Sequence, residues 1–162
     1  MADLNEIAQP FIDMAHKIVW CAVGTTDKKG RPRTRILHPI WELKDGKPLG
    51  WIATGATPIK VAHLEASPHV SCNYWTPEHD TCLAECRASW VTDEESKAYV
   101  WDMLKNGPEP VGYDPAMIPG WENASSPGFA ALKLDPWRLR VMPAAAMLTG
   151  EGTLVWQEIW QE

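Results

Sequence analysis

A chain of 162 residues has room for one compact domain, and its 45% apolar and 22% charged residues are ordinary for a soluble globular protein. The net charge of −6 disfavours nucleic acid as a partner, because a phosphate backbone requires a basic surface. The sequence contains no apolar run of about 18 residues and no signal-peptide pattern at its start, so we expect a cytoplasmic protein that does not cross a membrane.

The first third of the chain predicts one helix and three strands. Apolar residues at helical spacing predict a helix over residues 4–17, which Pro10 should shorten or kink. The β-prone runs that follow are separated by a turn with Asp27 and Gly30 and by a second turn at residues 45–48. The strands are expected at residues 18–24, 31–43 and 49–54.

The middle of the chain continues with a short helix, two strands and a second helix. Thr57 and Pro58 are typical of a helix start, with Thr57 as the cap. Thr92 and Glu95 have the spacing of a capping box, which predicts a helix that runs to about Lys105. The two strands are expected at residues 69–75 and 80–92.

Residues 106–127 are rich in Pro, Gly, Asn and Ser and predict a long loop, and loops of that length are usually functional or flexible. Strand-like sequence returns at residues 128–134, 137–142 and 153–160. Six or seven strands joined mostly as hairpins, with two or three short helices, predict a mainly β protein. We therefore expect one domain over residues 1–162, built as an antiparallel β-barrel with helical decoration.

The four cysteines do not form a CxxC pair. His79, Cys82 and Cys86 are close in sequence, but they lack further ligands at the spacing of a zinc ribbon, and both cysteines fall in a predicted strand. We expect reduced, buried, structural cysteines and no metal site.

Basic residues gather in one segment of this acidic chain, at Lys28, Lys29, Arg31, Arg33 and Arg35. Such a local excess favours a small anion over a long polyanion. Side chains alternate faces along a strand, so the three arginines should point the same way. A solvated strand face explains Arg31 and Arg33 equally well, whereas Arg35 precedes the apolar Ile36 and Leu37 and should approach the core.

The helix start at Thr57 supplies a second indication of an anion. A first helical turn exposes free N–H groups and the positive end of the helix dipole, and acidic side chains are favoured there. This helix places Lys60 in that turn instead. Either Lys60 extends into water, or an anion bound at the helix start uses Thr57 and Lys60 together.

These segments, taken in order, resemble the pyridoxamine 5′-phosphate oxidase-like family of FMN-binding split barrels. The likeness covers about residues 18–105 and lies in G30-x-P32-x-x-R35-I36-L37, in W51-I-A-T54-G-A-T57-x-x-K60, and in L64-x-x-S67-P68-x-V70 with Y74-W75. It implies a split β-barrel that binds FMN and forms a homodimer with its cofactor sites at the subunit interface.

The resemblance also implies which residues bind the cofactor. Arg35 and Lys60 would hold its phosphate, Thr54 and Thr57 would add hydroxyl contacts, and the backbone of Ile36 and Leu37 would lie along the flavin ring. Further contributors to the cofactor site are expected at Arg33, Trp137 and Arg140.

The chain lacks the C-terminal Arg-Leu-His-Asp-Arg run with which pyridoxamine phosphate oxidases hold their substrate, and it has Ile59 where they usually carry an arginine. We therefore expect an FMN-dependent oxidoreductase that acts on a small organic substrate other than vitamin B6. Two alternatives stay open: a reductase that uses the deazaflavin coenzyme F-420, and a flavin-binding or sensing protein without turnover. No side chain stands out as a catalytic acid or base.

Overall fold

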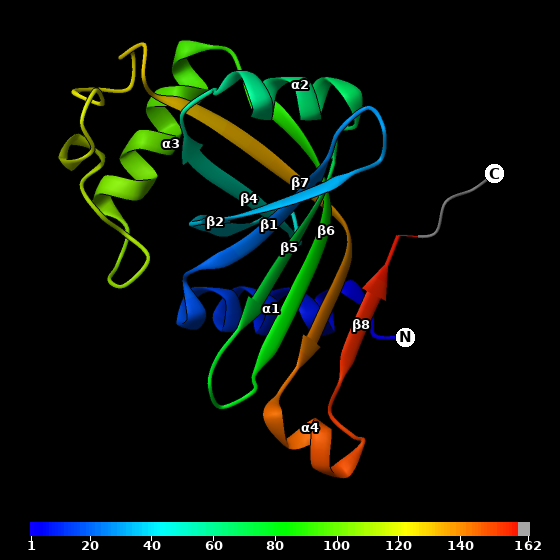
Figure 1. Cartoon of the computed structure of the whole chain (residues 1–162). Helices are drawn as coiled ribbons and strands as arrows, with labels where there is room; N and C mark the ends of the chain where they lie inside the picture. Colours follow the sequence, from blue (N-terminus) through cyan, green and yellow to red (C-terminus); the bar gives the residue numbers. More distant parts are fainter. Residues whose placement is uncertain (159–162) are drawn as a thin grey trace.

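The computed structural model describes residues 1–158, in which eight strands form one antiparallel sheet that curls into a barrel (Figure 1). The strands are β1 Cys21–Thr26, β2 Pro32–Leu37, β3 Pro39–Lys44, β4 Lys47–Thr54, β5 His69–Trp75, β6 Thr81–Val91, β7 Ala130–Met142 and β8 Leu154–Gln157. The helices are α1 Leu4–Ile18, α2 Pro58–Ala66, α3 Glu94–Asn106 and α4 Ala144–Thr149, with a 3₁₀ turn at Pro115–Met117. The predicted mainly β, antiparallel class is confirmed.

The order of the strands explains how the barrel closes and why it is split. Strands run β2-β1-β5-β6-β7-β4-β3, with β8 added to β7, so β2 and β3 lie at opposite ends of the hydrogen-bonded order. These two edge strands are nevertheless consecutive in the chain, because only His38 separates them. The prediction of one strand over residues 31–43 was wrong at this point: Pro39 fixes its own φ and restricts the residue before it, and the chain turns there.

Helix α1 closes one end of the barrel with its apolar face (Figure 1). Phe11 is fully buried and meets the ring of Trp41 edge-on at 4.8 Å, and Trp41 Nε1 donates a hydrogen bond of 2.8 Å to the Tyr74 hydroxyl. The expected interruption at Pro10 was wrong, because the helix is continuous over 15 residues with Pro10 on its exposed side.

A second apolar cluster fixes the long loop to one flank of the barrel. Trp101 of α3 and Trp121 of the loop both meet Phe129 edge-on, each with ring centroids 5.2 Å apart. Trp121 Nε1 also donates to the Gly128 carbonyl at 2.8 Å. These contacts hold residues 106–127 beside α3, and both segments are drawn in yellow to yellow-green in Figure 1.

Two local predictions need correction, and a third lies partly outside the described residues. The cap of α3 is Asp93, which accepts from Ser96 N at 2.8 Å, because the helix begins one residue later than the Thr92 capping box requires. β7 is one long strand with a register shift opposite Glu85 and Cys86, so the two strands expected there are one, and helix α4 was not predicted. Residues 159 and 160, expected in the last strand, lie outside the described residues.

The four cysteines lie buried in the barrel as free thiols, as predicted. Across residues 1–158, the structure contains no cluster of His, Cys, Asp or Glu suited to a metal ion. None of the helices in the described part of the chain is long and apolar enough to span a membrane.

Candidate functional site

Arg35 is held in place by a short polar chain that leads from β2 through β1 to α2. The Arg35 guanidinium donates from Nη1 to the Thr25 hydroxyl at 2.9 Å, and that hydroxyl lies 2.9 Å from Nδ1 of His63. Thr25 and His63 are buried, and the antiparallel register places Arg35 opposite Val23 on the face that points into the barrel. The guanidinium is therefore aimed by partners that carry no negative charge.

Lys60 approaches the same place from the first turn of α2. Its ammonium donates to the hydroxyl of Thr54, the buried last residue of β4. The side chain therefore turns back toward the barrel, so the interpretation in which Lys60 extends into water does not describe this conformation. The strand end and the helix start together place a cation and a hydroxyl at one point.

Arg35 and Lys60 are close enough to repel each other. Burial and the charge of Arg35 hold the pKa of Lys60 below its usual value, and burial and the charge of Arg33 do the same to the pKa of Arg35. None of the ion pairs formed among residues 1–158 includes these three cations. Two half-buried cations without a carboxylate form a site that a bound anion would stabilise.

The start of α2 adds to the same positive field. Thr57 caps the helix with extended backbone, but its side chain makes no capping hydrogen bond, and the first turn contains no acidic residue. The exposed Thr57 hydroxyl and the first N–H groups of the helix remain available to an acceptor from outside. We call Arg35, Lys60, Thr54 and Thr57 the clamp. A phosphate dianion matches its charge and its hydrogen-bond donors.

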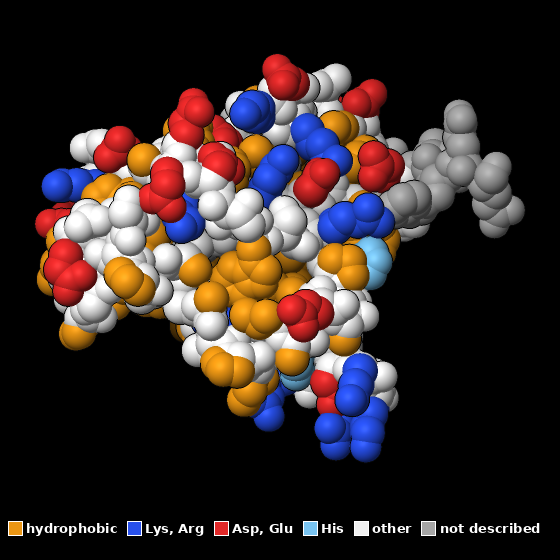
Figure 2. Space-filling view, turned by 90° about the horizontal axis from the view of Figure 1, so that it is seen from above, with side chains coloured by type: hydrophobic (Ala, Val, Ile, Leu, Met, Phe, Trp, Pro, Cys, Tyr) orange, Lys and Arg blue, Asp and Glu red, His pale blue; other side chains and the backbone are white. Residues whose placement is uncertain are grey.

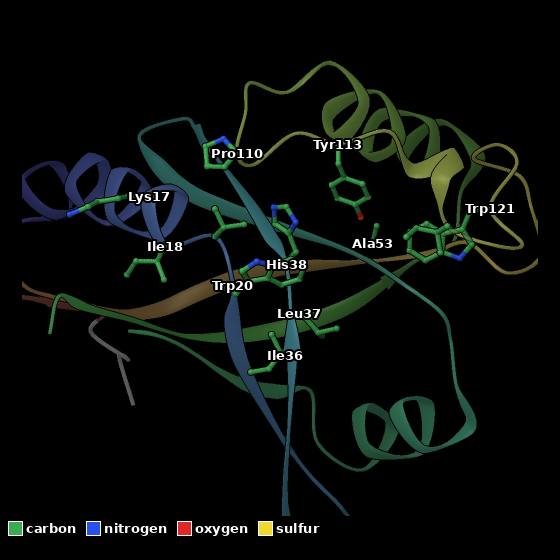
Figure 3. Close-up of a pocket in the computed structure, with 12 residues that line it drawn as sticks. Lys17, Ile18, Trp20, Ile36, Leu37, His38, Ala53, Pro110, Tyr113 and Trp121 are labelled. Carbon is green, nitrogen blue, oxygen red and sulfur yellow. The ribbon is translucent and has the colours of Figure 1, made fainter. Parts of the chain in front are cut away.

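A cavity of about 620 Å³ lies between the β2–β3 corner and the long loop (Figure 3). It is bordered by Ile36 and Leu37 just beyond Arg35, and by Ala53 next to Thr54, so it begins beside the clamp. The loop contributes Tyr113 and Trp121 to the opposite wall. The cavity would be within reach of a ligand whose phosphate is bound in the clamp. A largely apolar lining beside a few polar groups is typical of a cofactor or ligand pocket.

His38, the corner residue between the edge strands, lies among aromatic rings at the cavity wall. Its ring is 5.4 Å from that of Trp20 and 5.3 Å from that of Tyr113. Its Nε2 is buried without a hydrogen-bond partner among the described residues. Burial, followed by the charge of His16, lowers the pKa of His38, so the imidazole is neutral at pH 7.

A second hollow, of about 590 Å³, lies between the β1–β2 turn and α2 on the other side of the clamp. Lys28, Lys29, Arg31 and Arg33 line it together with His63. The prediction that Arg31 lies on the strand face with Arg33 and Arg35 was wrong. Arg31 precedes β2 and pairs with Asp27 of the turn at 2.6 Å.

Figure 2 shows hydrophobic side chains at the centre of one face of the molecule, with Lys and Arg side chains on either side of them. On the outer face of the sheet, Ile36 of β2 is 64% exposed, and Ala22 and Asn73 follow it across β1 and β5. Trp75, two residues after Asn73 on β5, lies on the same face and is 55% exposed, and Trp20, just before β1, is 62% exposed. The exposed Ile36 side chain therefore follows Arg35 directly in the sequence but lies on the opposite face of β2.

The structure brings most of the sequence-predicted residues together but leaves two apart. Trp137 and Arg140 belong to β7, which β1, β5 and β6 separate from β2 along the sheet. Arg140 is exposed and donates to Met142 Sδ at 3.2 Å. Trp137 lines a separate hollow of about 310 Å³ with Thr25, and its Nε1 is buried without a partner among the described residues.

Sequence reasoning missed Thr25 and His63 behind Arg35, and Trp20, His38 and Tyr113 around the cavity. Thr25 left a trace in the sequence, because it continues the buried alternation of Cys21 and Val23 with a polar side chain. The other residues come from separate elements and meet only in the folded chain.

The antiparallel split barrel, with a cationic clamp beside a largely apolar cavity, places this protein in the class of split barrels that have an anion-binding site. The sequence profile described as pyridoxamine 5′-phosphate oxidase matches residues 9–141. The chain therefore belongs to the pyridoxamine 5′-phosphate oxidase family.

Solved structures share this fold at low sequence identity. A protein of Clostridium acetobutylicum related to general stress protein 26 aligns with a TM-score of 0.70 and 14% identity, over 96% of each chain. An FMN-binding, pyridoxamine 5′-phosphate oxidase-related protein of Nostoc punctiforme PCC 73102 aligns with a TM-score of 0.66 and 16% identity, over 96% of this chain and 90% of that one. An F420 reductase aligns with a TM-score of 0.56 and 12% identity, over 80% of this chain and 94% of that one. No curated protein sequence matches the chain significantly.

Proposed function

We propose that this protein is an FMN-dependent oxidoreductase that acts on a small organic substrate other than vitamin B6. The observation that supports it most directly is the clamp, in which Arg35 and Lys60 converge, half-buried and without a carboxylate, next to the cavity. The FMN-binding neighbour with the same fold supports the choice of cofactor. Bound FMN would supply the redox chemistry, while the protein binds and orients it and limits the access of water.

The clamp residues divide the work of holding FMN. Arg35 and Lys60 would bind the phosphate oxygens as charged donors, with Thr54 and Thr57 adding hydroxyl groups. Since Ile36 and Leu37 border the cavity immediately after Arg35, we propose that their backbone lies along the flavin ring. Arg33, exposed and two residues before Arg35 on β2, would add positive charge at the mouth of the site.

We propose a cytoplasmic homodimer in which the cofactor lies at the subunit interface. The exposed Ile36 and Trp75 support this arrangement, since large apolar side chains on a flat sheet face are typical of an interface. Trp137 and Arg140, which are remote from β2 within one subunit, would then contact the cofactor of the other subunit. Ile36→Glu should convert a dimer to a monomer in size-exclusion chromatography with light scattering. Leu43→Glu, which changes an exposed apolar residue on the other edge strand, β3, should not.

A second candidate keeps the site and changes the cofactor to coenzyme F-420. The basic hollow beside the clamp favours it, because Lys28, Lys29 and Arg33 could pair with the acidic tail of that deazaflavin. The F420 reductase with the same fold is a further support. The deazaflavin transfers hydrides only, so the two candidates also differ in the acceptors they can serve.

The experiment is a titration of the purified protein with FMN and with F-420, followed by absorbance and fluorescence. Tight FMN binding that is lost in Arg35→Ala and Lys60→Ala supports the main proposal, and preference for F-420 supports the second. If neither ligand binds, the proposed cofactor site is wrong. Oxidation of a nicotinamide donor by the loaded protein then distinguishes an enzyme from a flavin-binding or sensing protein without turnover.

A further inference from the structure

We propose that the part of the cavity lined by Trp20, His38 and Tyr113 binds an uncharged, planar ring compound that carries a carbonyl oxygen, with the Tyr113 hydroxyl as its hydrogen-bond donor. The site lies between Trp20, His38 and the long loop (Figure 3). Binding of such a compound follows from the cavity alone. Its role as the reaction partner of a flavin rests on the proposed function.

The shape of this part of the cavity selects a flat molecule. Trp20, His38 and Tyr113 form a row of rings, with the imidazole 5.4 Å from one neighbour and 5.3 Å from the other. Ile18 and Pro110 lie in the same part in Figure 3 and add aliphatic surface. Aromatic rings bind other rings by offset or edge-on contact, so a planar ligand gains most from this wall.

The charges around the cavity select a neutral molecule. Lys17 is the one cation among the described residues that line it, and its ammonium is 2.9 Å from a carboxylate oxygen of Asp80. No carboxylate of the described residues belongs to the lining, and His38 is neutral. An anionic or cationic ligand would lose its water without gaining an unpaired opposite charge.

A directed polar group gives the site a preference for carbonyl compounds. Figure 3 shows the Tyr113 hydroxyl pointing into the cavity, toward the region of Ala53 and His38. Burial raises the pKa of Tyr113, so the phenol keeps its proton and can donate it to an acceptor. The unpartnered Nε2 of His38 is a second polar atom at this wall that a ligand or a water molecule would satisfy.

The test uses duroquinone, a neutral quinone whose ring is fully substituted and therefore does not alkylate the cysteines. Its Kd is measured by isothermal titration calorimetry on the full chain, with and without FMN. Tyr113→Phe keeps the ring and should weaken binding about fivefold, the value of one ordinary hydrogen bond. Tyr99→Phe removes a hydroxyl bonded to Glu42 outside the cavity and should leave the Kd unchanged. An analogue with a negatively charged carboxymethyl group in place of one methyl should bind more weakly than duroquinone, because the cavity offers it no unpaired cation.

Binding that leaves FMN in place and depends on Tyr113 supports the proposal. Three results would overturn it: no duroquinone binding to either form, equal affinity in the wild type and Tyr113→Phe, or release of one FMN for each duroquinone bound. If FMN itself fails to bind but duroquinone binds and depends on Tyr113, the proposed cofactor function is wrong and the ring site stands.

Discussion

Replacing Lys60 with methionine tests the clamp with little change in side-chain length. The ammonium is half-buried, donates to Thr54, and has no carboxylate partner among the described residues, so a phosphate would be its main electrostatic partner. A hydrogen bond to a charged group contributes about 1.5–3 kcal/mol. Lys60→Met should therefore raise the Kd of FMN by roughly 10- to 150-fold, at 1.4 kcal/mol for each factor of ten.

The assay compares FMN with riboflavin, which has the same ring but no phosphate. Quenching of flavin fluorescence gives both Kd values for the wild type and for Lys60→Met. The riboflavin Kd should change less than threefold, since the ring does not need the ammonium. Lys47→Met is the matched control, because Lys47 is also partly buried but bonds Asp135 at 2.8 Å at the other end of β4.

Two results would refute this reasoning. If Lys60→Met weakens riboflavin and FMN equally, the lysine supports the fold or the ring site and does not bind phosphate. If Lys47→Met weakens FMN as much as Lys60→Met does, the effect is long-range charge and the clamp geometry is irrelevant.

Three further predictions concern pH and stability. Because burial and a neighbouring cation lower the pKa of Lys60, FMN affinity should fall as pH rises through that lowered pKa, and Lys60→Arg should remove this fall; identical pH profiles would contradict this. The same lowered pKa means that the charged form of Lys60 destabilises the folded protein at any pH at which the lysine is protonated in both the folded and the unfolded protein. Lys60→Met should therefore raise the melting temperature of the flavin-free protein at pH 7, and this gain should vanish above the pKa that the lysine has in the unfolded chain. A lower melting temperature would contradict this. Gly50→Ala would place a Cβ 2.8 Å from the buried ring of Trp41 and should cost about 1–3 kcal/mol in chemical denaturation, whereas Gly55→Ala, with its nearest contact at 3.8 Å, should cost less than half of that.

The sequence was sufficient to predict the hairpins and the helix start of this fold. β-prone runs bounded by turn residues identified β1, β4, β5 and β6. The start of α2 was also recognised, because Thr57 and Pro58 form a local signature. The break at His38 was missed because the residues on both sides are equally β-prone and Pro39, which turns the chain, also fits the first position of a strand. The two segments pair with different strands, β1 and β4.

The candidate site was predictable to the extent that it is local. Arg35 and Lys60 could be selected because each stands out against its own strand or helix. The chain of contacts from Arg35 through Thr25 to His63 joins three elements, and no spacing in the sequence encodes it. The same holds for Tyr113, which a loop without regular periodicity brings to the cavity wall.

The split of the barrel explains why the site lies where it does. β2 and β3 each pair with one strand, so both have an edge without a partner in the sheet that the structure describes. An open edge exposes backbone donors and acceptors, which most proteins protect with short or charged strands. Here β2 is six residues long and carries Arg33 and Arg35, and the clamp and the cavity adjoin it. Alternate residues of an edge strand point their N–H and C=O groups away from the partner strand, so one of the two residues Ile36 and Leu37 offers these groups to a planar ring whose hydrogen-bonding atoms would replace a neighbouring strand. A side chain at either position can vary without loss of such bonds, because they are made by the backbone.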